Sequence, residues 1–200
     1  VDYAGGIYQL ERATSAPDRQ PFPTRLSETG LFEEGWVPAS GVQPFFVNAE
    51  MWSDHAQAER FVALPGKSVI LTNARDVWLY QSKNEWRYPT NAVLAKTLSL
   101  EMESGKADTL RRVETQLLHY DGLDWRAYSY RWNSSGTDAE LVEPDGAEVT
   151  FKIRDPNAPG GIRQQPWRFH SRTECLRCHN PWVNYALAFT APQLNRDVVY

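Results

Sequence analysis

The feature that most constrains this chain is a five-residue pattern near its end, Cys175-Leu176-Arg177-Cys178-His179. Two thiols at this spacing, followed at once by a histidine, are the attachment signature of c-type haem. The thiols form thioether bonds to the two vinyl groups of one porphyrin, and the imidazole of His179 binds the iron as its proximal ligand. The chain contains 2 cysteines, so a single covalent haem c accounts for both. The pattern therefore predicts a haem c protein.

Two other uses of a cysteine pair fit this sequence less well. A structural zinc ion needs about four ligands, usually from two paired motifs, whereas His55, His119 and His170 are scattered singly along the chain. A redox-active Cys-x-x-Cys pair is typical of a strand-to-helix turn in an α/β pattern. The stretch before the first cysteine, 167–173, instead indicates a polar loop, so haem attachment is the favoured interpretation.

Length and composition indicate one globular domain outside the bacterial cytoplasm. Two hundred residues, 42% hydrophobic and 23% charged, bury a single sizeable core. The net charge of −4 provides no basic surface for nucleic acid or anionic membranes, and no apolar run approaches the roughly 20 residues of a membrane span. The chain starts at Val1 without a signal peptide. Because c-type haem is attached outside the cytoplasm, we expect a periplasmic or secreted protein whose signal peptide lies upstream of this chain.

Aromatic, proline and glycine content favours a mainly β (α+β) fold, an antiparallel sheet body with a C-terminal haem-bearing segment. Alternating apolar residues predict three long strands, over 93–102, 112–120 and 125–132. The turn 121–124 should join the last two as a hairpin. On the strand 112–120, four residues are expected to share one face: Val113, Thr115, Leu117 and His119. Shorter strands are expected at 68–72, 77–81 and 149–154.

Helix signals are few, so an all-α cytochrome c architecture is not expected. Ser53 or Asp54 could cap a helix over 55–61. Ser171 or Thr173 could cap a short turn that carries the cysteines, and Pro192 could open a last helix.

The sequence leaves the sixth ligand of the iron open. His119 ends a strand on the face of Leu117 and could point inward to the iron, or it could be a half-buried histidine at a strand terminus. Met51 and Met102 are the other candidates, since a thioether ligand raises the reduction potential, although methionine in such runs also fills cores. An open sixth position beneath an aromatic side chain is the last alternative.

Three more residues are candidates for contact with the cofactor. Trp167 and Trp182 flank the cysteines and could pack on the porphyrin edge, or could be ordinary core anchors. Arg172 could pair with a haem propionate, because a planar guanidinium suits carboxylates. It could equally be a solvated loop charge.

Stretches across most of the chain also resemble a bacterial family of multi-domain c-type cytochromes, found fused after PQQ-dependent glucose/sorbosone-type sugar dehydrogenase propellers. These stretches are 22–32, 47–54, 113–118, 128–133, 137–142, 171–179 and 193–196. The resemblance implies that residues 1–23 are a propeller-end remnant and linker, and that residues 24–200 are a single haem c domain. Family members typically continue to a second Cys-x-x-Cys-His segment, and this sequence ends at Tyr200, so we expect one haem.

The resemblance implies electron transfer, with no catalysis by the domain itself. The haem would accept electrons from the PQQ-dependent sugar dehydrogenase and pass them to a downstream cytochrome or copper oxidase. Two alternatives stay open. One is a haem enzyme or gas-binding domain with an open sixth position, and the other is an electron donor to a secreted copper polysaccharide monooxygenase.

Overall fold

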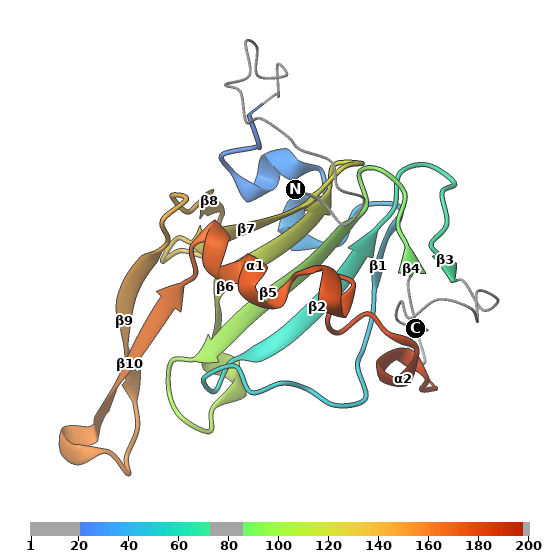
Figure 1. Cartoon of the computed structure of the whole chain (residues 1–200). Helices are drawn as coiled ribbons and strands as arrows, with labels where there is room; N and C mark the ends of the chain where they lie inside the picture. Colours follow the sequence, from blue (N-terminus) through green and yellow to red (C-terminus); the bar gives the residue numbers. More distant parts are fainter. Residues whose placement is uncertain (1–20, 73–85, 198–200) are drawn as a thin grey trace, which may run out of the picture.

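A six-stranded antiparallel sheet forms the centre of the protein (Figure 1). The computed structural model describes residues 21–72 and 86–197. The expected strand 77–81 and nearly all of the expected propeller-end and linker segment 1–23 lie outside these residues. The strand order is β1-β2-β5-β6-β7-β8. Their bounds are β1 (Val42–Pro44), β2 (Gln57–Ala63), β5 (Val93–Glu101), β6 (Leu110–Tyr120), β7 (Trp125–Trp132) and β8 (Ala139–Leu141).

Two smaller sheets and several short helices complete the described structure. One sheet is a hairpin of β9 (Ala147–Arg154) and β10 (Ile162–Phe169), and the other pairs β3 (Leu71–Thr72) with β4 (Trp86–Arg87). The α-helices are α1 (Arg172–Cys178) and α2 (Ala191–Leu194). The 3-10 turns are η1 (Leu26–Thr29), η2 (Glu34–Trp36), η3 (Ala107–Thr109), η4 (Pro159–Gly161) and η5 (Pro181–Val183). The expected mainly β fold with few helices is confirmed. Among the described residues, no helix has the length and apolar character needed to cross a bilayer.

The central sheet buries both of its faces. The N-terminal face, which includes Leu117 and Tyr130, packs against the segment 22–42. The opposite face, here called the α1 face, holds two apolar clusters. Leu98 and Leu100 pack with residues of the β9–β10 hairpin, and Leu118 packs with Trp125 and Ala127 beside Cys175 of α1. Side chains alternate along a strand, so Leu117 and Leu118 serve opposite faces.

The three long strands and the β6–β7 hairpin agree with the sequence-based predictions, with one correction at Val113. The β5–β6 register shifts between Leu98 and Ser99, placing Leu98 opposite Glu114 and Ser99 opposite Arg112. Val113 is therefore the extra residue of a β-bulge, and it packs with Leu98 on the α1 face. The prediction that Val113 shares a face with Leu117 and His119 is wrong, because a bulge reverses the alternation at this position.

Two further predictions of secondary structure are wrong. The expected helix over 55–61 is strand β2. Asp54 and His55 have φ angles of 49° and 69°, so they form a turn, whereas a helix needs an extended cap residue and right-handed residues after it. The expected loop over 167–173 begins inside strand β10, in which Trp167 and Phe169 are buried while Arg168 between them is exposed.

Candidate functional site

Helix α1 carries both cysteines, and a capping box at its first turn fixes the residue at which the helix begins. The Ser171 hydroxyl accepts a hydrogen bond from the backbone N–H of Glu174 (3.1 Å), and the Glu174 carboxylate accepts one from the backbone N–H of Ser171 (2.9 Å). Arg168, near the end of β10, donates to the same carboxylate at 2.8 Å. The predicted cap at Ser171 is confirmed, and it ties α1 directly to the hairpin.

This cap makes the stability of the protein depend on pH. The backbone N–H of Ser171 and the guanidinium of Arg168 lower the pKa of Glu174 from 4.5 to about 2. A depressed carboxyl pKa contributes stability that is fully present above the unfolded pKa and is lost as the pH falls through the folded one. We therefore expect Glu174→Gln to lower the thermal unfolding midpoint at neutral pH, with a deficit relative to the wild type that shrinks between pH 4.5 and about 2.

The matched control for this prediction is Glu148→Gln. Glu148 is the other carboxylate that pairs with Arg168, but it caps no helix. Its replacement should lower the midpoint less than Glu174→Gln does. A Glu174→Gln deficit of equal size at pH 2 and at neutral pH would contradict the prediction.

The two thiols of α1 are free and differ in their surroundings. Cys175 is half-buried against Leu118 and Trp125, and Cys178 is exposed. Burial raises the pKa of Cys175 to about 11, so this thiol is protonated at neutral pH. Reactive Cys-x-x-Cys thiols have lowered pKa values. The environment of Cys175 therefore does not favour disulfide exchange.

His179 is the C-cap residue of helix α1, and a hydrogen bond holds its ring. Its ring Nδ1 lies 2.5 Å from the backbone carbonyl oxygen of Tyr185, so Nδ1 carries the proton that it donates and Nε2 keeps its lone pair. Burial lowers the pKa of His179, which favours the neutral ring. The chain returns to the ring through Asn184 and Tyr185, whose φ angles are 50° and 59°. Sequence analysis missed Tyr185, because a backbone carbonyl has no signature in the sequence.

These residues fit a covalently attached haem. A metal-binding histidine almost always donates its other ring N–H to a carbonyl or carboxylate, and this bond fixes the tautomer. His179 has this arrangement one residue after Cys178. Exposed apolar side chains lie between and after the thiols, with Leu176 37%, Trp182 91% and Val183 40% exposed. An apolar macrocycle attached to α1 could cover them.

The other residues predicted to contact the cofactor have separate surroundings. The Trp167 indole N–H donates to Glu114 Oε2 at 3.0 Å in the core, so this side chain is an anchor for the hairpin. The Arg172 guanidinium lies over the Tyr128 ring, 5.1 Å from its centroid. Trp182 alone of the three is open to solvent beside the cysteines.

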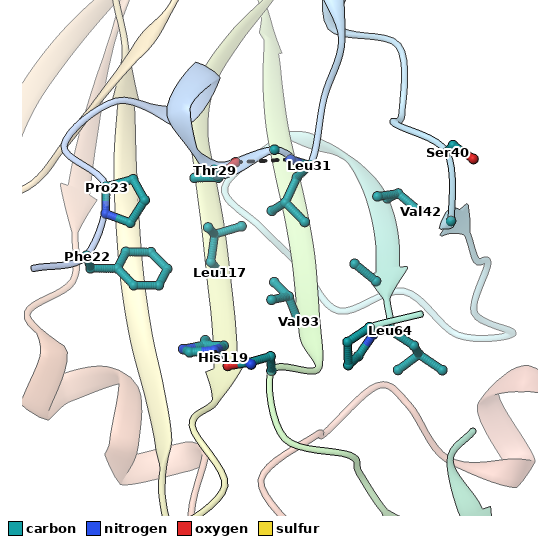
Figure 2. Close-up of a pocket in the computed structure, with 15 residues that line it drawn as sticks. Phe22, Pro23, Thr29, Leu31, Ser40, Val42, Leu64, Val93, Leu117 and His119 are labelled. Atoms are coloured by element: carbon teal, nitrogen blue, oxygen red, sulfur yellow. Dashed lines mark hydrogen bonds between the residues drawn. The ribbon is translucent and has the colours of Figure 1, made fainter. Parts of the chain in front are cut away.

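His119 lies on the N-terminal face, across the sheet from Cys175. There it lines a cavity of about 340 Å³ together with Phe22, Leu31 and Leu117 (Figure 2). Its Nε2 is 3.3 Å from Asn91 Oδ1. The neighbouring residue on β6, Leu118, is the one that faces Cys175. The structure therefore does not bring His119 and His179 together.

The two methionines lie in contrasting places. Met102 is partly buried and packs against the cluster of Leu98 and Leu100 beneath the hairpin. Met51 is 69% exposed in the loop before β2. For Met102 this is the core-filling role that the sequence left as the alternative to ligation.

A row of polar side chains crosses the α1 face and was missed by sequence analysis. Register places Arg60 opposite Lys96, Lys96 opposite Gln116, and Gln116 opposite Ser129. Glu114, buried beside this row, accepts hydrogen bonds from Ser129, Gln116 and Trp167. The sequence does contain a signal for this row, because these strands carry polar residues at positions on both faces of the sheet.

Comparisons with protein families, with curated proteins and with solved structures find no match for this chain. The motif and the geometry around it therefore carry the functional argument.

Proposed function

We propose that residues 24–200 form a mono-haem c-type cytochrome domain that transfers electrons. The observation that carries the proposal is the Cys-x-x-Cys-His pattern ending in a half-buried imidazole whose Nδ1–H is held by the Tyr185 carbonyl. When bound, haem supplies a one-electron carrier at its iron. In this proposal Cys175 and Cys178 hold the macrocycle through thioether bonds, and His179 Nε2 is the proximal ligand. The carbonyl of Tyr185 keeps the ring in the tautomer that ligation requires.

The proposed partners follow from the family resemblance. The donor is an upstream PQQ-dependent sugar dehydrogenase domain, and the acceptor is a downstream cytochrome or copper oxidase, in the periplasm or outside the cell. The exposure of Cys178 and Trp182 supports this role, because it puts one edge of the attachment segment at the molecular surface. Exchange of electrons with another protein requires such an accessible edge.

A haem enzyme or gas-binding domain with an open sixth position is the second candidate function. The observation that favours it is the location of the expected sixth ligands. His119 is on the opposite face of the sheet, Met102 is in the core beneath the hairpin, and Met51 is largely exposed. Donation of electrons to a copper polysaccharide monooxygenase is a variant of the first proposal and differs only in the acceptor.

Visible absorption spectra of the ferric and ferrous protein, matured in a host that attaches haem c, test the proposal. Electron transfer predicts sharp, split bands in the reduced form that carbon monoxide does not alter. A high-spin spectrum that shifts with carbon monoxide would favour the open site instead.

His179→Ala should abolish the wild-type spectrum, since it removes the proximal ligand. His119→Ala is the matched control and should leave the spectrum unchanged. A switch to high spin in His119→Ala would make His119 the sixth ligand.

A further inference from the structure

Two cations stand side by side on the α1 face, where the acids among the described residues do not fully balance their charge. Arg60 on β2 is directly opposite Lys96 on β5. Their strand neighbours Phe61 and Ala95 belong to the N-terminal face, so alternation directs Arg60 and Lys96 to the α1 face. Like charges directly opposite each other across two strands are destabilising. The fold therefore maintains an arrangement that calls for an anion.

Burial makes this arrangement costly. Arg60 is only 7% exposed, and its ion pair is with Glu50, whose side chain is 58% exposed, at 3.2 Å. The Lys96 ammonium donates to the Ser53 hydroxyl at 3.2 Å, a neutral partner. A buried charge is tolerated when it is paired and hydrogen-bonded. Arg60 thus has one exposed carboxylate as its direct partner, and Lys96 has a neutral hydroxyl.

The nearby acids do not fully offset this cost, because burial and the charge of Arg60 lower the pKa of Lys96 more than the charges of Glu114 and Glu50 raise it. Glu114 is 2% exposed, and its oxygens already accept hydrogen bonds from Ser129, Gln116 and Trp167. Burial raises its pKa, which favours the uncharged form. Within the part of the chain that the structure describes, Arg60 and Lys96 therefore leave room for a further anion.

The cation pair lies on the same face as the attachment segment. Along β5, Lys96 stands between Leu94, which packs in the cluster of Cys175, and Leu98, which packs under the hairpin. Lys96 therefore lies between the cluster that includes Cys175 and the cluster under the hairpin.

We propose that Arg60 and Lys96 bind the two propionate carboxylates of the covalently attached haem. This inference rests on the proposed haem c function and assigns the residues that seat the polar edge of the macrocycle. A planar guanidinium can hold one carboxylate through two parallel hydrogen bonds, and a lysine ammonium is a point charge for the second. The propionates would in turn neutralise the pair. The role first expected of Arg172 thus passes to residues on β2 and β5.

The test is the reduction potential of the holoprotein in Lys96→Met and Arg60→Met. Each variant removes a cation that disfavours the positively charged ferric iron, so each should lower the equilibrium constant for haem reduction at least tenfold, a shift of about 59 mV for one electron. The propionate bending bands in the resonance Raman spectrum should move in the same variants. Lys96→Arg, which keeps the charge, should restore both readouts to near the wild type.

Lys152→Met on β9 is the matched control, because Lys152 is an exposed cation and the substitution changes the net charge equally. It should leave the potential and the propionate bands unchanged. Equal shifts in Lys96→Met and Lys152→Met would overturn the inference, as would unmoved propionate bands.

If Arg60→Met fails to fold, Lys96→Met alone tests the inference, because the Lys96 side chain is only partly buried. A high-spin spectrum in Lys96→Met would make Lys96 an iron ligand and overturn the propionate assignment. A wild-type protein without covalent haem would instead overturn the proposed function and the inference together.

Discussion

The double variant Cys175→Ala/Cys178→Ala, matured beside the wild type in a host that attaches haem c, will contain no covalent haem. No other thiol exists in the chain, so neither vinyl group can form a thioether bond. Each single variant should retain one bond and hold haem poorly. Haem staining after denaturing electrophoresis measures the covalent fraction, and the pyridine haemochrome spectrum reports how many vinyl groups remain unreacted.

Leu176→Ala provides the control for the cysteine variants. Leu176 lies between the two thiols and is 37% exposed, so its truncation leaves the spacing of the motif and the cap of α1 intact. It should carry a full complement of haem. Normal yields of fully loaded double variant would refute covalent attachment through these thiols.

Gly146→Ala will destabilise the protein strongly and displace the start of α1. Gly146 has a φ of 82°, and a Cβ at this position would overlap the Phe169 carbonyl oxygen and would lie 2.8 Å from the Ser171 nitrogen. Both atoms belong to backbone at the junction of β10 and α1, which cannot rotate away as a side chain would. A positive φ alone costs about 1–3 kcal/mol, and the steric overlap adds to it. We expect a total loss above about 3 kcal/mol, in the range of the most damaging single substitutions.

Gly136→Ala separates the two contributions to this loss. Gly136 has a φ of 68°, but nothing lies within 4 Å of a Cβ built there. Its replacement should cost only the conformational strain, about 1–2 kcal/mol. Urea unfolding of the two variants measures the difference. Equal free energies of unfolding would show that the junction yields to the extra methyl group.

Sequence reasoning predicted those parts of the fold in which alternation is regular and long. The strands β5, β6 and β7 carry such patterns, and a clear turn joins the last two. The failures have local causes. At β2 the sequence offers a plausible helix cap at Asp54 and no regular alternation, and pairing with β5 makes the segment a strand. At Val113 the bulge depends on the register of two strands, which neither strand specifies alone.

The candidate site was predictable only where it is local in sequence. The spacing of Cys175, Cys178 and His179 and the cap at Ser171 can be read from one short segment. The location of His119 could not be predicted, because a period-two pattern shows which residues share a face but not which face receives α1. Arg60 and Lys96 come from strands far from the motif in sequence. Their pairing follows from sheet topology, which composition and periodicity leave open.

The short length of α1 limits the transfer of the Cys-x-x-Cys-His segment to another protein. A helix of 7 residues is well below the roughly 12–15 residues at which isolated helices become even marginally stable in water. A peptide that spans residues 171–185 would therefore sample many shapes, and His179 would lose its hold on the Tyr185 carbonyl. Grafting the pattern alone onto another scaffold would transfer the thiols but not the oriented imidazole. A transplant of this segment must include the sheet on which it rests.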